Sequence, residues 1–206
     1  MTDQTLRQLQ QHGTSSFPIS VSFVYLSEYK GMQFPHHWHD EFEFLLIHSG
    51  QMRYTANNES VVLDPGDAIF FNSGALHTGA AVALKDCTYF AVTLHPDFFG
   101  MPGTALAENY ITPFCDSPFF NFYKFAASRE ADRPVLRTLE SVCALYDTQD
   151  VCRDIDIYTH VLQLWRALFL CCRDSLSFDF YSSESERLHK MLADIKTNYN
   201  QPITLD

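Results

Sequence analysis

Four side chains between residues 37 and 77 have the chemistry of metal ligands. His37, His39 and Glu43 all stand at odd positions. Alternate side chains of an extended strand share a face, so these three can point the same way. His77 follows on a second predicted strand, after the turn at 64–67. Three imidazoles and one carboxylate suit zinc, iron, nickel, copper or manganese, and they leave coordination positions open for water or a ligand.

The residues around these side chains follow two spaced patterns. The first, Gly31-x5-His37-x-His39-x3-Glu43-x6-Gly50, resembles the first sequence motif of the cupins, with every fixed position filled. The second, Gly66-x5-Asn72-x-Gly74-x2-His77, resembles the second cupin motif. It departs from the family at Asn72, where proline is usual, and at Ala81, where asparagine is usual. The resemblance implies a jelly-roll barrel that carries the four polar side chains.

Two interpretations of the polar cluster stay open. In the first, His37, His39, Glu43 and His77 hold a divalent metal, which we expect to be zinc, nickel, iron or manganese. In the second, the cluster holds no metal, and the histidines hydrogen-bond Glu43 or a ligand. The departure at Asn72 bears on this choice, because it could shift the turn that presents His77.

The periodicity of the chain predicts an α+β fold, a cupin-type jelly-roll barrel followed by a C-terminal helical segment. Alternating apolar residues predict strands over 19–27, 42–48, 51–56, 60–63, 68–71 and 88–95. The strand from Phe42 is apolar on both faces, so we expect it to be covered on both sides. Residues 96–118 are rich in proline and aromatic residues but have no period, and we expect a loop packed against the barrel.

A helical period begins after residue 131. One predicted helix follows the apolar positions 135, 139, 142 and 146, and a second spans 154–173. The second helix has two apolar stripes, one of Ile155, Tyr158, Leu162, Trp165, Phe169 and Cys172, the other of Ile157, Val161, Leu164, Leu168 and Cys171. Two stripes need two partners. One is the barrel or the preceding helix. The other is either a second subunit or a further part of this chain. Ser183–Glu186 is a capping box that predicts a third helix.

The last nineteen residues, 188–206, resemble the entry to an AraC-type DNA-binding domain. The resemblance rests on a helix that ends in Tyr199 and on the segment Pro202-Ile-Thr-Leu, which would cap the next helix. The stretch His37-Trp38-His39-Asp40-x-x-Glu43 is also similar to the opening of AraC-family sensor cupins. The resemblance implies a bacterial one-component transcription regulator, in which the cupin senses a small molecule and a following domain reads DNA.

These observations divide the chain into four parts. We expect an N-terminal arm over 1–18, a cupin effector-sensing domain over 19–130, a helical dimerisation or linker segment over 131–200, and the start of a truncated helix-turn-helix domain over 201–206. The arm is either a frayed terminus or a segment that folds over the pocket when ligand binds. We expect a small effector inside the barrel, bound by His37, His39, Glu43, His77, Trp38, Tyr25 and Tyr54.

The charge and hydrophobicity of the sequence argue against two classes of partner, nucleic acids and membranes. The net charge of −11 argues against contact between this segment and DNA phosphates, so we expect DNA to be bound only through the missing domain. The first residues are polar and no apolar run could span a bilayer, which predicts a cytoplasmic protein that makes no membrane contact. Two rival functions remain: a metal-dependent cupin enzyme, either a dioxygenase or an isomerase, and a purely structural module that forms homodimers.

Overall fold

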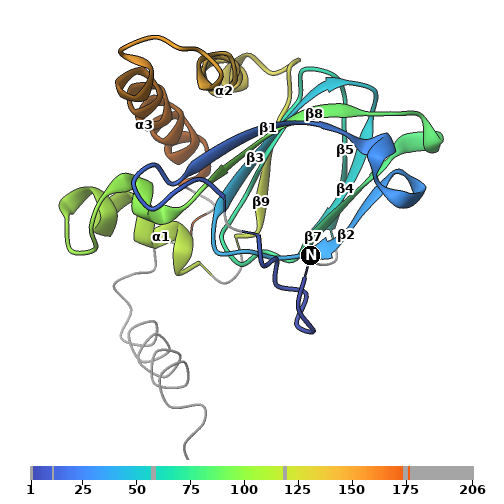
Figure 1. The fold of residues 1–206 in the computed structure, drawn as a ribbon, viewed down its shortest axis with the longest axis horizontal. Helices are drawn as coiled ribbons and strands as arrows, with labels where there is room; N and C mark the ends of the chain where they lie inside the picture. Colours follow the sequence, from blue (N-terminus) through green and yellow to red (C-terminus); the bar gives the residue numbers. More distant parts are fainter. Residues whose placement is uncertain (1, 11, 57–58, 118–119, 174–175, 177–206) are drawn as a thin grey trace, which may run out of the picture.

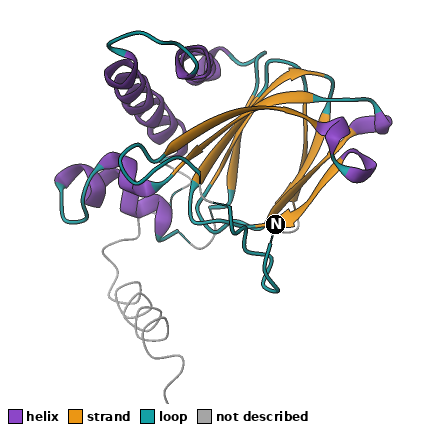
Figure 2. Cartoon of the chain, in the orientation of Figure 1, coloured by secondary structure: helices purple, strands orange, loops and turns teal. Residues whose placement is uncertain are grey.

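The computed structural model of this chain describes residues 2–10, 12–56, 59–117, 120–173 and 176. Two antiparallel sheets face each other to form a barrel, and helices pack outside one of them (Figure 1, Figure 2). The larger sheet has the order β1-β8-β3-β6-β9 and the smaller one the order β2-β7-β4-β5. The strands are β1 Ile19–Tyr25, β2 Gln33–His37, β3 Phe42–Ser49, β4 Met52–Ala56, β5 Glu59–Leu63, β6 Ala68–Phe71, β7 His77–Ala81, β8 Thr88–Leu94 and β9 Phe122–Phe125. The fold is therefore the predicted cupin-type barrel.

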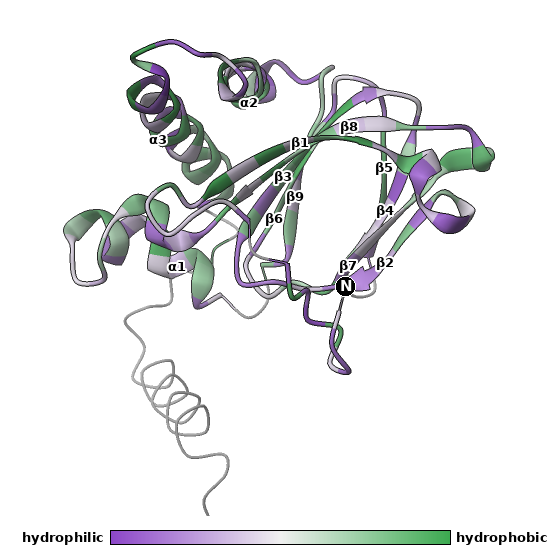
Figure 3. Ribbon diagram, viewed as in Figure 1, coloured by the Kyte–Doolittle hydropathy of each residue, from purple (hydrophilic) through white to green (hydrophobic). Residues whose placement is uncertain are grey.

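Strand β3 separates two hydrophobic cores. Phe42, Phe44 and Leu46 belong to the core that the larger sheet shares with the helices. Leu45 and Ile47, which point the other way, belong to a second core inside the barrel. Figure 3 shows hydrophobic residues along the larger sheet where the helices cover it. The prediction that this strand is covered on both sides is confirmed.

Two long helices follow the barrel, α2 Arg133–Tyr146 and α3 Arg153–Cys172. In α3 the second predicted stripe packs inward, since Ile157, Val161, Leu164 and Leu168 are all buried. The first stripe is divided. Trp165 is buried, whereas Ile155 is 68% exposed and Leu162 is 43% exposed. Packing within the described residues therefore accounts for one stripe and leaves part of the other uncovered.

Residues 96–118 contain more structure than the predicted loop. They form a 3₁₀ turn over Pro96–Phe99, a π-helical turn over Ala107–Ile111 and the short helix α1 Thr112–Cys115. Their aromatic side chains pack against α3. Phe99 and Phe114 contact Trp165, with ring centroids 4.7 and 4.8 Å apart, while Phe98 packs on Tyr158 and Tyr110 on Phe169. Turns of this length show no hydrophobic period, so the pattern in the sequence could not reveal them.

Some predicted features lie outside the described residues. These are the capping box at 183–186, the helix that follows it, and the segment 201–206. Where the chain is described, strands β4 and β5 pair in the register expected of the hairpin between them. No helix in the described ranges has both the length and the apolar character needed to cross a membrane.

Gly50, the last residue of the first motif, stands where a side chain has no room. Its φ is +75°, and a Cβ built on it would overlap the backbone carbonyl of Asp86 and lie 2.9 Å from Cα of Cys87. We expect Gly50→Ala to lower the free energy of unfolding by about 2–4 kcal/mol, measured by urea titration. The matched control is Gly31→Ala, because Gly31 has φ +73° but open space around it. The control should lose only about 1–2 kcal/mol, and equal losses would contradict the steric argument.

Candidate metal centre

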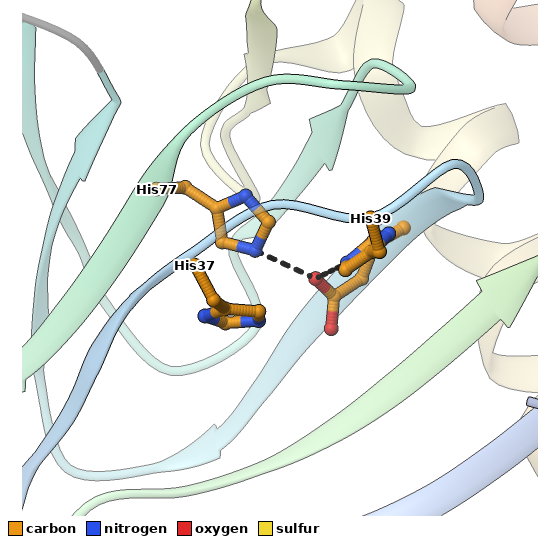
Figure 4. Close-up of side chains that lie close together, drawn as sticks. His37, His39 and His77 are labelled. Carbon is orange, nitrogen blue, oxygen red and sulfur yellow. Dashed lines mark hydrogen bonds and ion pairs between the residues drawn. The ribbon is translucent and has the colours of Figure 1, made fainter. Parts of the chain in front are cut away.

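Four side chains from two facing sheets converge beside the barrel cavity. His37 ends β2 and is paired across the smaller sheet with His77, the first residue of β7. Glu43 lies near the start of β3 in the larger sheet, and His39 lies in the connection between β2 and β3. One potential ligand atom from each residue lies within 4.8 Å of the others. Figure 4 shows the three imidazoles gathered around one carboxylate.

The route that brings these residues together differs from a single extended strand. Strand β2 stops at His37 and β3 begins at Phe42, so the chain crosses from one sheet to the other between them. Hydrogen bonds hold the crossing in place. The Gly74 amide donates to the His39 carbonyl at 2.8 Å, and the Ser73 hydroxyl donates to the Asp40 carbonyl at 2.8 Å. Alternation therefore grouped the residues correctly, although Glu43 comes from the opposite sheet.

Backbone carbonyls orient all three imidazoles in the same sense. Each ring places its Nδ1 against a carbonyl oxygen, at 3.0 Å in His37, 3.1 Å in His39 and 2.7 Å in His77. A carbonyl only accepts hydrogen bonds, so in each neutral ring Nδ1 carries the hydrogen and Nε2 keeps its lone pair. When all three rings are neutral, three Nε2 lone pairs are thus left for the centre, which is the tautomer that a metal-binding histidine requires.

The carboxylate of Glu43 organises the charge of the cluster. Burial acts to raise the pKa of this carboxyl, but the neighbouring His39 and His77 imidazoles hold it well below its usual range. Burial acts to lower the pKa of His39, yet the hydrogen bond and charge of Glu43 outweigh it and raise that pKa. For His37, burial and His77 lower the pKa to about 4, so this ring is neutral at pH 7.

One atom of the cluster tests whether a cation fits. His77 Nε2 is buried and has no hydrogen-bond partner among the described residues, although it lies 3.3 Å from Oε2 of Glu43. His39 Nε2 lies 3.4 Å from the same oxygen. A ring nitrogen and a carboxylate oxygen at these distances need either a proton between them, as in the His39–Glu43 hydrogen bond, or a cation. The donor set therefore fits a divalent metal.

The cluster borders a cavity of about 310 Å³ between the two sheets. Two of the four residues, His37 and Glu43, contribute directly to its wall. The remaining lining residues are uncharged apart from His12, which can titrate, and combine hydroxyl, phenol and amide groups with apolar ones: Thr2, Gln8, Gln10, Ser22, Val24, Tyr29, Phe34, Pro35, Leu45, Tyr89, Ala91 and Thr93. No lysine or arginine occurs among these described lining residues. The wall is suited to hydrogen bonding rather than to neutralising an anion.

Comparison with known proteins identifies the family of this chain. The sequence profile of the AraC-like ligand binding domain matches residues 21–192. The chain belongs to this family. A curated relative, the uncharacterized HTH-type transcriptional regulator YdeC of Bacillus subtilis (strain 168), is 27% identical over 207 residues, which cover 99% of this chain and 69% of that protein.

Solved cupin structures align with part of the chain. A Cupin 2 conserved barrel domain protein from Salinispora arenicola CNS-205 has 17% identity and a TM-score of 0.35, covering 50% of this chain and 79% of the other. A cupin superfamily protein from Desulfitobacterium hafniense DCB-2 has 17% identity and a TM-score of 0.34, covering 37% of this chain and 67% of the other.

In this AraC-like ligand-binding domain, the three aromatic residues expected to contact the effector lie in different places. Tyr54 is buried beside the cluster, with its ring centroid 5.9 Å from that of His77, but it does not line the cavity. Tyr25 is 46% exposed and packs on Phe23 at the outer face of β1. Strand parity explains this, because the even residues of β1 line the cavity and the odd ones face away.

The third aromatic residue, Trp38, holds the N-terminal segment, described at residues 2–10 and 12, against the barrel. Its backbone exchanges hydrogen bonds with Leu6 and Gln8, and its indole Nε1 donates to the Thr5 carbonyl at 2.9 Å. Arg7 pairs with Asp40 and places its guanidinium 5.5 Å from the indole ring. Because Trp38 and Asp40 alternate with the two histidines, one stretch of chain serves both the centre and the segment.

This docking brings residues to the site that the sequence analysis did not single out. The N-terminal segment supplies Thr2, Gln8, Gln10 and His12 to the cavity wall. The sequence analysis left open whether residues 1–18 are a frayed terminus or an arm over the pocket. The segment has no hydrophobic period that could have placed it. One signal was present, namely the outward-pointing Trp38 and Asp40 in an otherwise inward-directed motif.

Proposed function

We propose that this chain is the effector-sensing part of a bacterial AraC-type transcription regulator, and that His37, His39, Glu43 and His77 hold a divalent metal beside the effector cavity. The observation that carries the proposal is that three imidazoles, each with its Nδ1 against a backbone carbonyl, bring their ligand atoms and that of the Glu43 carboxylate within 4.8 Å of one another at the cavity wall. A bound metal would supply a Lewis-acid position that anchors an oxygen atom of the effector. His37 and Glu43 line the cavity, so a metal that they held would be next to a bound effector.

The charge balance of the site favours an uncharged effector. Two carboxylates, Glu43 and the buried Glu41, would neutralise a divalent cation, and the described lining offers no cationic side chain for a second anion. The hydroxyl, phenol and amide groups of the wall suit hydroxyl or carbonyl oxygens instead. We therefore propose a small neutral effector rich in hydrogen-bonding oxygens, sized for a cavity of about 310 Å³.

A thermal-shift experiment tests the metal and the effector separately. Zinc in hundredfold excess over its dissociation constant stabilises a folded protein by about 2.7 kcal/mol, which for a chain of this size raises the Tm by about 5–10 °C. We expect zinc to raise the Tm, a chelator to reverse the shift, and neutral polyols or carbonyl compounds to add to it. No shift with zinc, nickel, iron or manganese would contradict the metal proposal.

We further propose that the protein is a cytoplasmic homodimer, joined through α3, and that α3 relays effector binding to a DNA-binding domain. The support is an apolar groove of about 340 Å³ beside the exposed part of the first stripe, lined by Leu106, Tyr110, Leu162, Trp165, Arg166, Phe169 and Leu170. Effector binding can shift the arrangement of two subunits only by its differential affinity for the two arrangements.

A charge placed in the groove should separate the subunits. Leu162→Glu is expected to convert a dimer into a monomer of unchanged helical content, because an unpaired carboxylate would be buried at the interface. The mass is measured by analytical ultracentrifugation. Ala144→Glu, which adds the same charge at an exposed position of α2, is the control and should remain dimeric. A Leu162→Glu dimer as stable as the parent would exclude this face.

The second candidate function is a metal-dependent cupin enzyme, a dioxygenase or an isomerase. The same observation supports it, since a four-residue donor set that borders a cavity could serve catalysis as well as sensing. Incubation of a candidate effector with the metal-loaded chain, monitored by chromatography, distinguishes a sensor from an enzyme. A regulator should return its effector unchanged, whereas an enzyme should consume it over many turnovers.

A further inference from the structure

A fourth histidine faces the cluster from the N-terminal segment. The ring of His12 lies 6.1 Å from that of His39, centroid to centroid, and contributes to the cavity wall. Its Nε2 is buried without a hydrogen-bond partner among the described residues. A buried polar nitrogen without a partner is costly, so a bound molecule that pairs with it removes that cost. The atom is thus placed to meet whatever occupies the cavity.

We propose that His12 is a fifth residue of the site, which contacts the atom bound at the open face of the metal centre rather than the metal. This inference rests on the proposed metal centre. The four donors of that centre lie within 4.8 Å of one another, and His12 falls outside this group. Its imidazole therefore faces the next shell, where a metal-bound water, anion or effector oxygen would lie.

The charges around His12 agree with this placement. Burial lowers its pKa, while the carboxylates of Glu41 and Glu43 act in the opposite direction and His39 adds to the lowering. Glu43 and His39 belong to the proposed metal centre, and Glu41 provides the carbonyl that orients His39. A neutral imidazole can either donate or accept through Nε2, so His12 can pair with a hydroxyl, a carbonyl or a small anion.

Two anchors fix His12 along the chain. On one side, the Gln8 amide donates to the Trp38 carbonyl at 2.8 Å. On the other, Gly13 has φ +75° and approaches the chain at Ile19 so closely that a Cβ would lie 2.6 Å from its amide nitrogen. The glycine permits the tight turn from the N-terminal segment into β1. These contacts lie on either side of His12 along the chain, and the His12 ring lines the cavity and faces His39.

The test uses the full chain loaded with Co²⁺, and azide as the probe of the open coordination face. Azide binding to Co²⁺ changes the visible absorption, so a titration gives its dissociation constant without any turnover. We expect His12→Ala to weaken azide binding about fivefold to tenfold, as loss of one hydrogen bond does. Co²⁺ affinity should stay within about twofold of the parent, because no metal ligand is removed.

Two further variants complete the experiment. His12→Gln keeps an N–H donor and should restore part of the azide affinity. His36→Ala removes an exposed imidazole one residue before His37 and should change neither affinity. Circular dichroism and the Tm of each variant show that it is folded.

The outcomes separate this inference from the proposed function. Unchanged azide affinity in His12→Ala would overturn the inference and leave the metal centre standing. A tenfold or greater loss of Co²⁺ affinity in His12→Ala would also overturn the inference, because it would indicate that His12 is itself a metal ligand. A parent chain that binds no Co²⁺ at all would remove the metal centre and this inference together.

Discussion

Replacing His39 by alanine is expected to weaken zinc binding by more than about a hundredfold and to leave the barrel folded. His39 is 3% exposed, its Nδ1 is fixed by the Glu41 carbonyl, and its Nε2 faces Glu43. Removal of the ring would take away one of the four proposed ligands and would also free the carboxylate that it helps to orient. Purified parent protein should contain close to one metal ion per chain by elemental analysis, and His39→Ala should contain almost none.

The control for this prediction is His36→Ala, because His36 is exposed and has the opposite strand parity to His37. It should retain the metal content and zinc affinity of the parent, measured by competition with a chromogenic chelator. A folded parent protein that stays free of metal after incubation with zinc would support the other interpretation, a polar cluster in which Glu43 and the histidines only hydrogen-bond.

Glu43→Gln distinguishes the two interpretations a second time. The amide has the same shape as the carboxylate but lacks its charge, so zinc affinity should fall strongly if a cation occupies the cluster. In a metal-free cluster the introduced amide would still hydrogen-bond the neighbouring rings, and the Tm would respond little to added zinc in either protein. The combination of zinc affinity and zinc-dependent Tm therefore identifies which interpretation holds.

The site was predictable to the extent that motif spacing encodes it. His37, His39, Glu43 and His77 meet as the two motifs imply, and Gly50 shows why one motif glycine is needed, since the backbone at Asp86 fills the space beside it. Spacing could not reveal the sheet crossing after His37. That crossing depends on hydrogen bonds to residues 73 and 74, which are distant in sequence.

The remaining parts of the fold depend on contacts without a sequence period. The N-terminal segment docks through hydrogen bonds to Trp38 and through the Arg7–Asp40 ion pair. These contacts follow no sequence period, so no pattern predicts the docking or the position of His12. In α3 both stripes are apolar, and only the packing of the chain decides that the stripe of Val161 is buried and that Leu162 is exposed. Periodicity predicted the helix but not its orientation.

The strongest destabilisation is expected from Trp165→Ala, which should lower the free energy of unfolding by about 3–5 kcal/mol. Trp165 is 3% exposed and lies where three parts of the chain meet. Its ring centroid is 4.7 Å from that of Phe42 on β3 and 4.8 Å from that of Phe114 on α1, and its Nε1 donates to the Tyr110 carbonyl at 2.9 Å. Truncation would leave a cavity and an unpaired carbonyl together.

Urea unfolding followed by circular dichroism measures this loss without depending on tryptophan emission. Trp165→Phe keeps most of the volume and should lose clearly less than the alanine variant. Ile155→Ala, ten residues earlier on α3, 68% exposed and outside the groove, should lose less than about 1 kcal/mol. Equal losses at 155 and 165 would contradict the packing described for α3.

Trp165 also connects β3, which carries Glu43, to α3. Phe42, which it contacts, is the residue before Glu43 on β3, and the two side chains point to opposite faces of the same sheet. A shift of β3 caused by binding at Glu43 would therefore reach α3 through one aromatic contact. Trp165→Phe should retain zinc affinity, because no ligand is touched, but should reduce any zinc-dependent change in hydrogen exchange of α3. An unchanged exchange response in a folded Trp165→Phe protein would show that the helix receives the signal by another route.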